Sequence, residues 1–431
     1  MSSAAPAAGV DPARSRGLRM LLSGSFPNLV QWYNLYVFAA FAPFFRTEFF
    51  DPADGGSLVY VYGIFALTFV MRPVGSWLFG RIADRRGLRF ALVSSVLLMS
   101  AGSAVLAVSP TASAAGAAAG GILLLVGLVQ GVATGGEYGV SAVYLSEVST
   151  DGRRGFFSSF QTATIVAGQV LAQATLLVLL TSVDRAEVSV WGWRVAFGIG
   201  ALAGLSTLLV ARRMPGERRR PAAGVTLAVL LREGWRPLLW VVLMTSGGTA
   251  AFYTFTVTVP AVSREAAYGS GGAAAERAST TAILLALIVL MVLQPVGGAL
   301  SDRVGRKALL VFFGVAGVIV IGPVVAVAGG LLDPWVLFAA LVAVFTVLTG
   351  YLATNTIVKA EAFPPQLRAL GVGFGYAVAN SLFGGTAPLI YHATAATPWV
   401  FSGYVTVLVG ITLATALTMR GGRTSPLDRR L

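Results

Sequence analysis

The sequence predicts an all-α polytopic membrane protein whose twelve transmembrane helices form two six-helix halves. Three observations predict this fold. Of 431 residues, 56% are hydrophobic and 11% are charged, with a mean hydropathy of +0.78. A soluble domain of this size cannot bury so much apolar surface, so lipid must act as the solvent. Apolar runs of about 20 residues, enough to cross a ~30 Å hydrocarbon core, recur along the chain. Two similar charged turns lie 218 positions apart, as a duplicated transporter fold would place them.

The apolar runs define the elements in order. We expect helices over 20–46, 57–80, 90–109, 119–147, 156–181, 194–211, 237–262, 280–300, 308–330, 335–358, 370–392 and 398–419. The polar segment 212–236 separates a first half (18–211) from a second half (237–419) and is read as a basic cytoplasmic linker. Residues 1–17 are read as a disordered cytoplasmic start and 420–431 as a cytoplasmic tail.

The orientation follows from the distribution of Lys and Arg. The loops on the side of both termini hold 25 of these residues, counting Lys359, and the opposite loops hold five, including Arg194. Because cytoplasmic loops carry the excess of cations, both termini are predicted to face the cytoplasm.

The repeated turns carry charges that suit a conformational latch. Gly80–Arg89 is echoed by Gly298–Lys307, and an acid seven residues before an Arg occurs twice, offset by 214. A carboxylate at a helix end can bridge to the N-terminus of a neighbouring helix and to a nearby Arg. Such contacts hold only while the two halves are closed on that face. We therefore expect the latch to comprise Asp84, Arg85, Arg89, Glu147, Arg154, Asp302, Arg303, Arg306, Glu361 and Arg368.

Two ionisable residues fall inside predicted spans. Arg72 lies roughly 18 Å along its helix from Asp84, and Glu137 roughly 15 Å from Glu147. Charges inside a bilayer are costly unless they are paired or hydrated, so each is a candidate functional residue. They can pair with each other, either to fix two helices or to serve a substrate or proton. Arg72, with Arg194 or Lys359 as further candidates, suits an anionic metabolite.

Polar side chains within the apolar runs are candidates for a central cavity. We expect substrate contacts from Arg72, Asn34, Tyr138, Gln161, Gln169, Tyr253, Asn355, Tyr376 and Asn380. Buried amides can equally join helices by hydrogen bonds. The glycines at 127, 131, 135 and 139 form a smooth stripe that favours close helix packing. Cysteine is absent and His392 is the lone histidine, and we expect no cofactor and no metal site.

Several ordered strings resemble the major facilitator superfamily and, within it, the metabolite:proton symporter branch. They are Met71–Gly75, Phe79–Asp84, Gln130-Gly131, Gly135–Gly139, Arg154–Gln161, Trp191–Arg194, Lys359–Pro364 and Arg368–Gly371. The strings Phe252–Phe255, Gln294-Pro295 and Gly375–Asn380 are most similar to the α-ketoglutarate permease group of that branch. The resemblance implies uptake of a small dicarboxylate such as α-ketoglutarate by alternating access.

The sequence departs from the branch at three positions. Asn34 stands where the branch has an acid, Gly127 where the superfamily commonly has an Arg, and Leu88 where a basic residue is usual. The resemblance implies that the first two positions take part in proton coupling. Arg72 and Glu137 remain as the proton-coupling candidates.

These observations predict a multi-pass protein of the cell membrane, not an enzyme and not a nucleic-acid-binding protein, whose partners are a small anionic metabolite, a proton and membrane lipid. A monomer is expected. The function we expect is proton symport. The alternatives are a facilitative uniporter, uptake of shikimate, citrate, an aromatic acid or betaine/proline, and a receptor that does not transport.

Overall fold

The structure, a computed structural model, describes residues 12–51, 56–148, 153–211, 226–330, 332–364 and 366–419. Helices make up nearly all of this part of the chain, and no strand occurs in it. Nine apolar helical stretches in these ranges are long enough to cross a membrane, and the longest, Trp235–Val304, holds two spans joined at Gly272. Gly272 has a φ of 65°, which a residue without a Cβ adopts readily, so the chain can reverse there.

The first half contains six membrane-crossing segments. They are α1 (Pro12–Phe49), α2 (Ser57–Val70) continued by α3 (Arg72–Arg86), α4 (Leu88–Ala107), α6 (Ala117–Val148), α7 (Arg154–Ser182) and α9 (Trp193–Ala211). Short connections are α5 (Ala112–Ala115), α8 (Arg185–Glu187) and a π turn (Val188–Gly192).

The second half also crosses six times. Its segments are α11 (Trp235–Tyr253) with a π turn (Thr254–Thr258) and the start of α12 (Val259–Val304), the rest of α12 after Gly272, α13 (Arg306–Val327), α14 (Pro334–Leu352) with α15 (Asn355–Ala362), α16 (Arg368–Ala379) with a π turn (Asn380–Gly384) and α17 (Ala387–Ala393), and α18 (Pro398–Leu417). A 3-10 turn (Ala328–Gly330) follows α13. Helix α10 (Leu227–Glu233) lies within the segment between the halves, where residues 212–225 are outside the described ranges.

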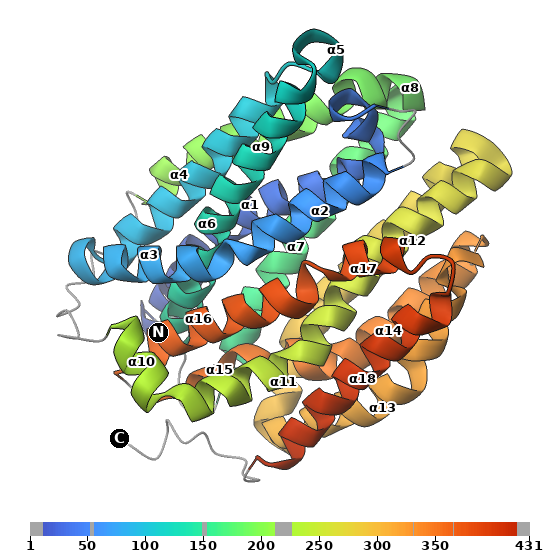
Figure 1. Cartoon of the computed structure of the whole chain (residues 1–431). Helices are drawn as coiled ribbons and strands as arrows, with labels where there is room; N and C mark the ends of the chain where they lie inside the picture. The colour runs from blue at the N-terminus through green and yellow to red at the C-terminus, as the bar shows by residue number, and fades with distance from the viewer. Residues whose placement is uncertain are drawn as a thin grey trace, which may run out of the picture.

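The two charged turns lie at the same end of the molecule and share a backbone conformation. Gly87 has a φ of 90° and Gly305 a φ of 94°, and each stands directly between two helices. We call this end, with α10 and α15, the hairpin end, and the opposite end, with α5 and α8, the far end (Figure 1). The matching turns are the structural counterpart of the sequence repeat.

The two halves lie side by side and touch along their length (Figure 1). Helix α7 of the first half packs along α12 of the second. Helix α16 packs on α3 and α6 toward the hairpin end, and α17 packs on α2 toward the far end. A site for a small molecule between the halves is therefore bounded by helices of both.

Candidate substrate site

Arg72 is placed by a break in the second span. Helix α2 ends at Val70 and α3 begins at Arg72, with Pro73 in its first turn, where a missing backbone amide costs no helical hydrogen bond. The glycine stripe of α6 lies against this break. A Cβ added at Gly135 would collide with the carbonyl oxygen of Arg72, and one added at Gly131 with that of Thr68. The glycines thus let α6 approach the backbone that holds Arg72.

The guanidinium of Arg72 lies between the halves among aromatic side chains. The side chain is buried, and its Nη1 donates to the hydroxyl of Tyr253, 3.4 Å away, in the second half. Its carbon Cζ lies 3.5 Å from the ring centre of Phe69 and 5.5 Å from that of Trp32. Its Nε and Nη2 have no hydrogen-bond acceptor among the described residues. A buried guanidinium with free donors is suited to an anion with two oxygens.

Lys359 is a second buried cation, and it corrects the expectation that this residue is a cytoplasmic loop cation. It lies on α15, which continues the tenth span past a break at Ala353 and Thr354, and its side chain is fully buried. Its Nζ donates to Oδ1 of Asn355 at 2.8 Å. The same nitrogen lies 4.3 Å from the ring centre of Tyr376 and 5.4 Å from that of Tyr138. Such ring faces stabilise a cation without neutralising it.

A small cavity borders the residues that contact Lys359. It is lined by Tyr138, Thr162, Ile165, Thr249, Phe252, Tyr351, Leu352, Asn355 and Tyr376, and the space open to the centre of a water molecule is about 20 Å³. Tyr138 of the first half stacks on Tyr376 of the second, with ring centres 3.4 Å apart. The hydroxyl of Tyr138 donates to Oδ1 of Asn355 at 3.0 Å. While these rings are stacked, the space is too small to hold a metabolite.

The structure brings most of the predicted polar residues to the interface between the halves. Tyr138, Tyr253, Asn355 and Tyr376 surround the cavity and the two cations, as described above. Gln169 donates through Nε2 to the carbonyl of Thr256, so it joins the halves near the same level. Gln161 donates to the carbonyl of Tyr138 at 3.2 Å. Asn380 accepts a hydrogen bond from Thr249, a lining residue, at 2.7 Å.

Asn34 and Arg194 are engaged elsewhere. Asn34 donates to the carbonyls of Val30 and Gly200, at 2.8 and 3.3 Å, and joins α1 to α9. Arg194 donates to the carbonyl of Ala107, the last residue of α4, and to that of Ser109 just beyond it, at the far end. These contacts are helix packing and capping in kind. A polar side chain in an apolar run can bond to a neighbouring helix or to a ligand. The sequence pattern is the same in both cases, so the sequence alone does not distinguish Asn34 and Arg194 from residues of a binding site.

Glu137 is fully buried on α6, directly before the cavity residue Tyr138. The hydrogen bond of Arg72 goes to Tyr253 rather than to Glu137. Gly127 lies earlier on the same helix, and a Cβ added there would lie 2.9 Å from the hydroxyl of Thr68. An Arg at that position, common in the superfamily, would not fit this packing.

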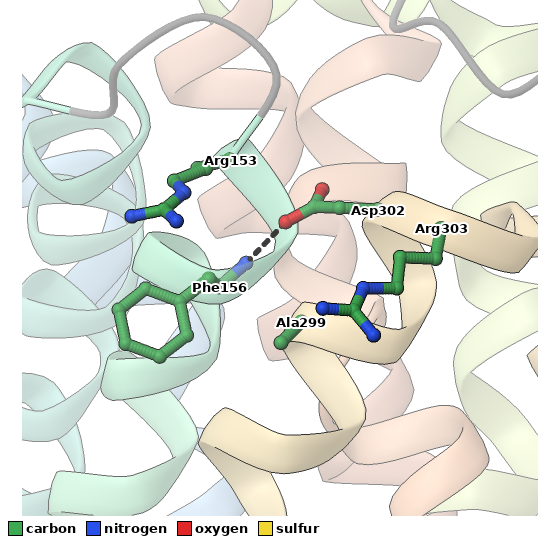
Figure 2. A pocket seen from close by; sticks show the side chains of 5 residues that line it. All are labelled: Arg153, Phe156, Ala299, Asp302 and Arg303. Carbon is green, nitrogen blue, oxygen red and sulfur yellow. Dashed lines mark hydrogen bonds between the residues drawn. The ribbon is translucent and has the colours of Figure 1, made fainter.

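At the hairpin end, Asp302 bridges the two halves. Its carboxylate accepts hydrogen bonds from the backbone amides of Gly155, at 2.8 Å, and Phe156, at 3.0 Å, in the first turn of α7. Figure 2 shows Asp302 facing Phe156, with the guanidinium groups of Arg153 and Arg303 on opposite sides of it. These residues and Ala299 line a cleft of about 390 Å³. A carboxylate on a helix N-terminus is stabilised by the helix dipole.

The other predicted latch residues differ in burial and in their contacts. Arg306, which is buried, pairs with Glu361 at 2.9 Å, and Arg368 donates to the carbonyl of Ala360 at 2.9 Å. Asp84 and Arg85 are exposed in the last turn of α3, Arg89 and Arg154 are half-buried, and Arg303 is exposed. The side chain of Glu147 lies outside the described part of the chain. Leu88 occupies the position in the first turn that Arg306 occupies in the second. The first turn therefore has no counterpart of the cation that pairs with Glu361 in the second half.

The far end carries an inter-half network that sequence reasoning missed. Arg185 of the first half pairs with Glu265 and, at 2.5 Å, with Glu276 of the second. Arg264 reaches back across the interface to Oε1 of Gln173 at 3.1 Å and to the carbonyl of Ala40 at 3.3 Å. By sequence, Arg185 and Arg264 count only among the five Lys and Arg residues in the loops opposite the termini. The acids that pair with Arg185 lie 80 and 91 positions away, so the pairs leave no local signal in the sequence.

Comparison with known proteins agrees with this architecture. A family model described as Major Facilitator Superfamily matches residues 21–388. The chain is similar to the alpha-ketoglutarate permease of Escherichia coli (strain K12), with 36% identity over 87% of each chain. It is also similar to a citrate-proton symporter of Salmonella typhi, with 29% identity over 89% of each.

Among solved structures, the chain resembles the proton:xylose symporter XylE bound to 6-bromo-6-deoxy-D-glucose. The TM-score is 0.71 at 17% sequence identity, covering 95% of this chain and 98% of that one. At that identity the likeness establishes the fold alone. It accounts for the twelve membrane-crossing segments and for their arrangement in two halves.

Proposed function

Because this chain belongs to the major facilitator superfamily, a family of multi-pass membrane transport proteins and not of enzymes, we propose that it moves a small organic anion across the cytoplasmic membrane. The substrate is a dicarboxylate such as α-ketoglutarate, and the mechanism is alternating access. The similarity to an alpha-ketoglutarate permease and to a citrate-proton symporter supports this substrate class.

The observation that carries the proposal is the state of Arg72. Its guanidinium is buried between the halves, and two of its nitrogens have no acceptor among the described residues. Burying such a group costs several kcal/mol. A substrate carboxylate that accepts from Nε and Nη2 offsets this cost, which gives the anion its affinity.

Transport is coupled to a proton in this proposal, with Glu137 as the proton site. Glu137 is buried next to the cavity residue Tyr138, and both positions that the resemblance implies for coupling, Asn34 and Gly127, are uncharged. An anion that occupies Arg72 changes the charge that Glu137 experiences, which links its protonation to substrate binding.

The two ends of the interface supply the alternation. The latch around Asp302 closes the hairpin end, and the Arg185 network closes the far end. Opening either end requires breaking only the contacts on that side. The excess of Lys and Arg near the charged turns supports a cytoplasmic hairpin end and cytoplasmic termini. The unit in lipid is a monomer, since the site is built from the two halves of one chain.

Uptake of radiolabelled α-ketoglutarate into proteoliposomes, with and without an imposed pH gradient, tests the proposal. We expect uptake that rises when the outside is acidic and collapses when a protonophore is added. Uptake that ignores the gradient would establish a uniporter instead. Specific binding without uptake or counterflow would establish a receptor. Competition by citrate, shikimate, aromatic acids and betaine separates the remaining substrate classes.

A further inference from the structure

We propose that Lys359 binds the second carboxylate of the substrate, so that the transporter selects dianions by taking one carboxylate from each half of the molecule. This inference rests on the proposed function and deepens it. Arg72 belongs to the first half and Lys359 to the second, and together they offer two positive charges at one interface.

The ammonium of Lys359 is incompletely satisfied. An ammonium has three N–H donors, and the acceptor that the structure gives it is one amide oxygen, Oδ1 of Asn355. That oxygen also accepts from the hydroxyl of Tyr138. Nζ also lies near the rings of Tyr376, Tyr138 and Tyr351. A lysine held only to stabilise the fold would be expected to meet a carboxylate or several carbonyls.

The groups that enclose Lys359 also line the cavity. Asn355, Tyr138, Tyr376 and Tyr351 all line that space, and each of them contacts Nζ. Tyr253, which accepts from Arg72, directly follows the lining residue Phe252. Residues that line the cavity therefore contact Lys359 directly and adjoin the residue that contacts Arg72.

The motion of the halves uncovers Lys359. The stacked rings of Tyr138 and Tyr376 come from opposite halves, so any separation of the halves at this level breaks the stack. The hydrogen bond from Tyr138 to Asn355 also crosses the interface and breaks with it. Nζ is then open to an anion, and closure around a bound dianion leaves no net charge on the two cations and the ligand.

This arrangement predicts discrimination between matched ligands. α-Ketoglutarate and 2-oxopentanoate share a 2-oxo acid end and differ by a carboxylate in place of a methyl group. A monoanion on Arg72 leaves the charge of Lys359 buried and unpaired, and we expect it to bind about 100-fold or more weakly.

The test compares these two ligands by competition against radiolabelled α-ketoglutarate in counterflow, for the wild type, Lys359→Met, Lys359→Arg and Lys307→Met. We expect Lys359→Met to lose most of the preference for the dicarboxylate, and Lys359→Arg to retain much of it. Lys307 is the matched control. It is the other lysine of the chain, and its Nζ donates to the carbonyls of Leu417 and Met419, outside the site.

A labelling measurement on the wild type keeps the inference testable if the Lys359 variants do not fold. With an amine-reactive acetylating reagent and mass spectrometry, α-ketoglutarate should protect Lys359 while Lys307 reacts at an unchanged rate, and 2-oxopentanoate should protect far less. Unchanged ligand preference in Lys359→Met, or labelling of Lys359 that ignores α-ketoglutarate, overturns the inference while transport stands. A wild type that neither accumulates nor exchanges α-ketoglutarate contradicts the proposed function itself.

Discussion

Arg72 and Lys359 differ from the other buried polar residues in what surrounds them. The amide nitrogen of Asn34 donates to two backbone carbonyls, and that of Gln161 donates to the carbonyl of Tyr138. The two cations instead face aromatic rings and neutral oxygens that come from both halves. The side-chain oxygens of Asn34 and Gln161 have no donor among the described residues, but they are acceptors and cannot bind a carboxylate. The two cations still have donors to give.

Glu137→Gln separates coupling from translocation. If Glu137 carries the proton, the amide variant should lose uptake driven by a pH gradient and keep counterflow of α-ketoglutarate, because exchange needs no net proton movement. Both activities are measured in the same proteoliposomes. Equal loss of both would assign Glu137 to binding or folding, and retention of both would remove it from the coupling mechanism.

The residue scale is also where the sequence predicted least. It placed Tyr138, Tyr253, Asn355 and Tyr376 among the candidates, and the structure brings them around one cavity and two cations. It counted Lys359 as a loop cation because a charge flanked by Glu361 and the turn at Pro364 ends an apolar run. The helix continues past that point as α15, and only the tertiary fold shows that the residue is buried.

At the scale of elements, the packing of α6 against the break between α2 and α3 fixes the position of Arg72. The glycine stripe was predictable from its spacing of four residues. Its partner was not, because close helix approach leaves no mark on the facing sequence. Here the partner is the backbone of Thr68, Arg72 and their neighbours.

Gly135→Ala should displace Arg72. The added Cβ collides with the carbonyl oxygen of Arg72, a backbone atom that cannot rotate away. We expect an overpacking cost of about 1–3 kcal/mol and a weaker apparent affinity for α-ketoglutarate. Gly121→Ala is the matched control, since Gly121 lies on the same helix and an added Cβ there meets nothing within 4 Å. Thermal unfolding in detergent and uptake kinetics would measure both, and equal behaviour of the two variants would contradict this packing argument.

At the scale of the whole molecule, two sets of contacts hold the halves together at opposite ends. The twelve spans and the two halves were predictable because hydrophobic length and repetition are local properties of the chain. The hairpin-end contact of Asp302 was predictable in kind, since its turn repeats. The far-end network was not, because Arg185 and its acids carry no repeated pattern.

Arg185→Met should favour opening of the far end. It removes the pairs with Glu265 and Glu276, and Glu276 is buried, so its charge is left without that partner. A loss of about 1.4 kcal/mol would shift the populations tenfold. The chain has no cysteine, so a single cysteine introduced by Ala40→Cys reports on the accessibility of the far end. The carbonyl of Ala40 accepts a hydrogen bond from Arg264 at that end. Labelling by a membrane-impermeant maleimide should rise with Arg185→Met and stay unchanged with Arg81→Met, whose side chain is exposed on α3. Labelling that is equal in all backgrounds would show that the network does not hold the far end closed.

The most direct test of the central claim is counterflow of radiolabelled α-ketoglutarate in proteoliposomes that contain the wild type, Arg72→Met or Arg81→Met. Counterflow requires both binding and alternating access but no driving ion, so it is independent of the coupling mechanism. The account predicts exchange in the wild type and in Arg81→Met. In Arg72→Met it predicts a loss of about 100-fold or more, because the carboxylate loses its paired donors. Undiminished exchange in correctly folded Arg72→Met would contradict it.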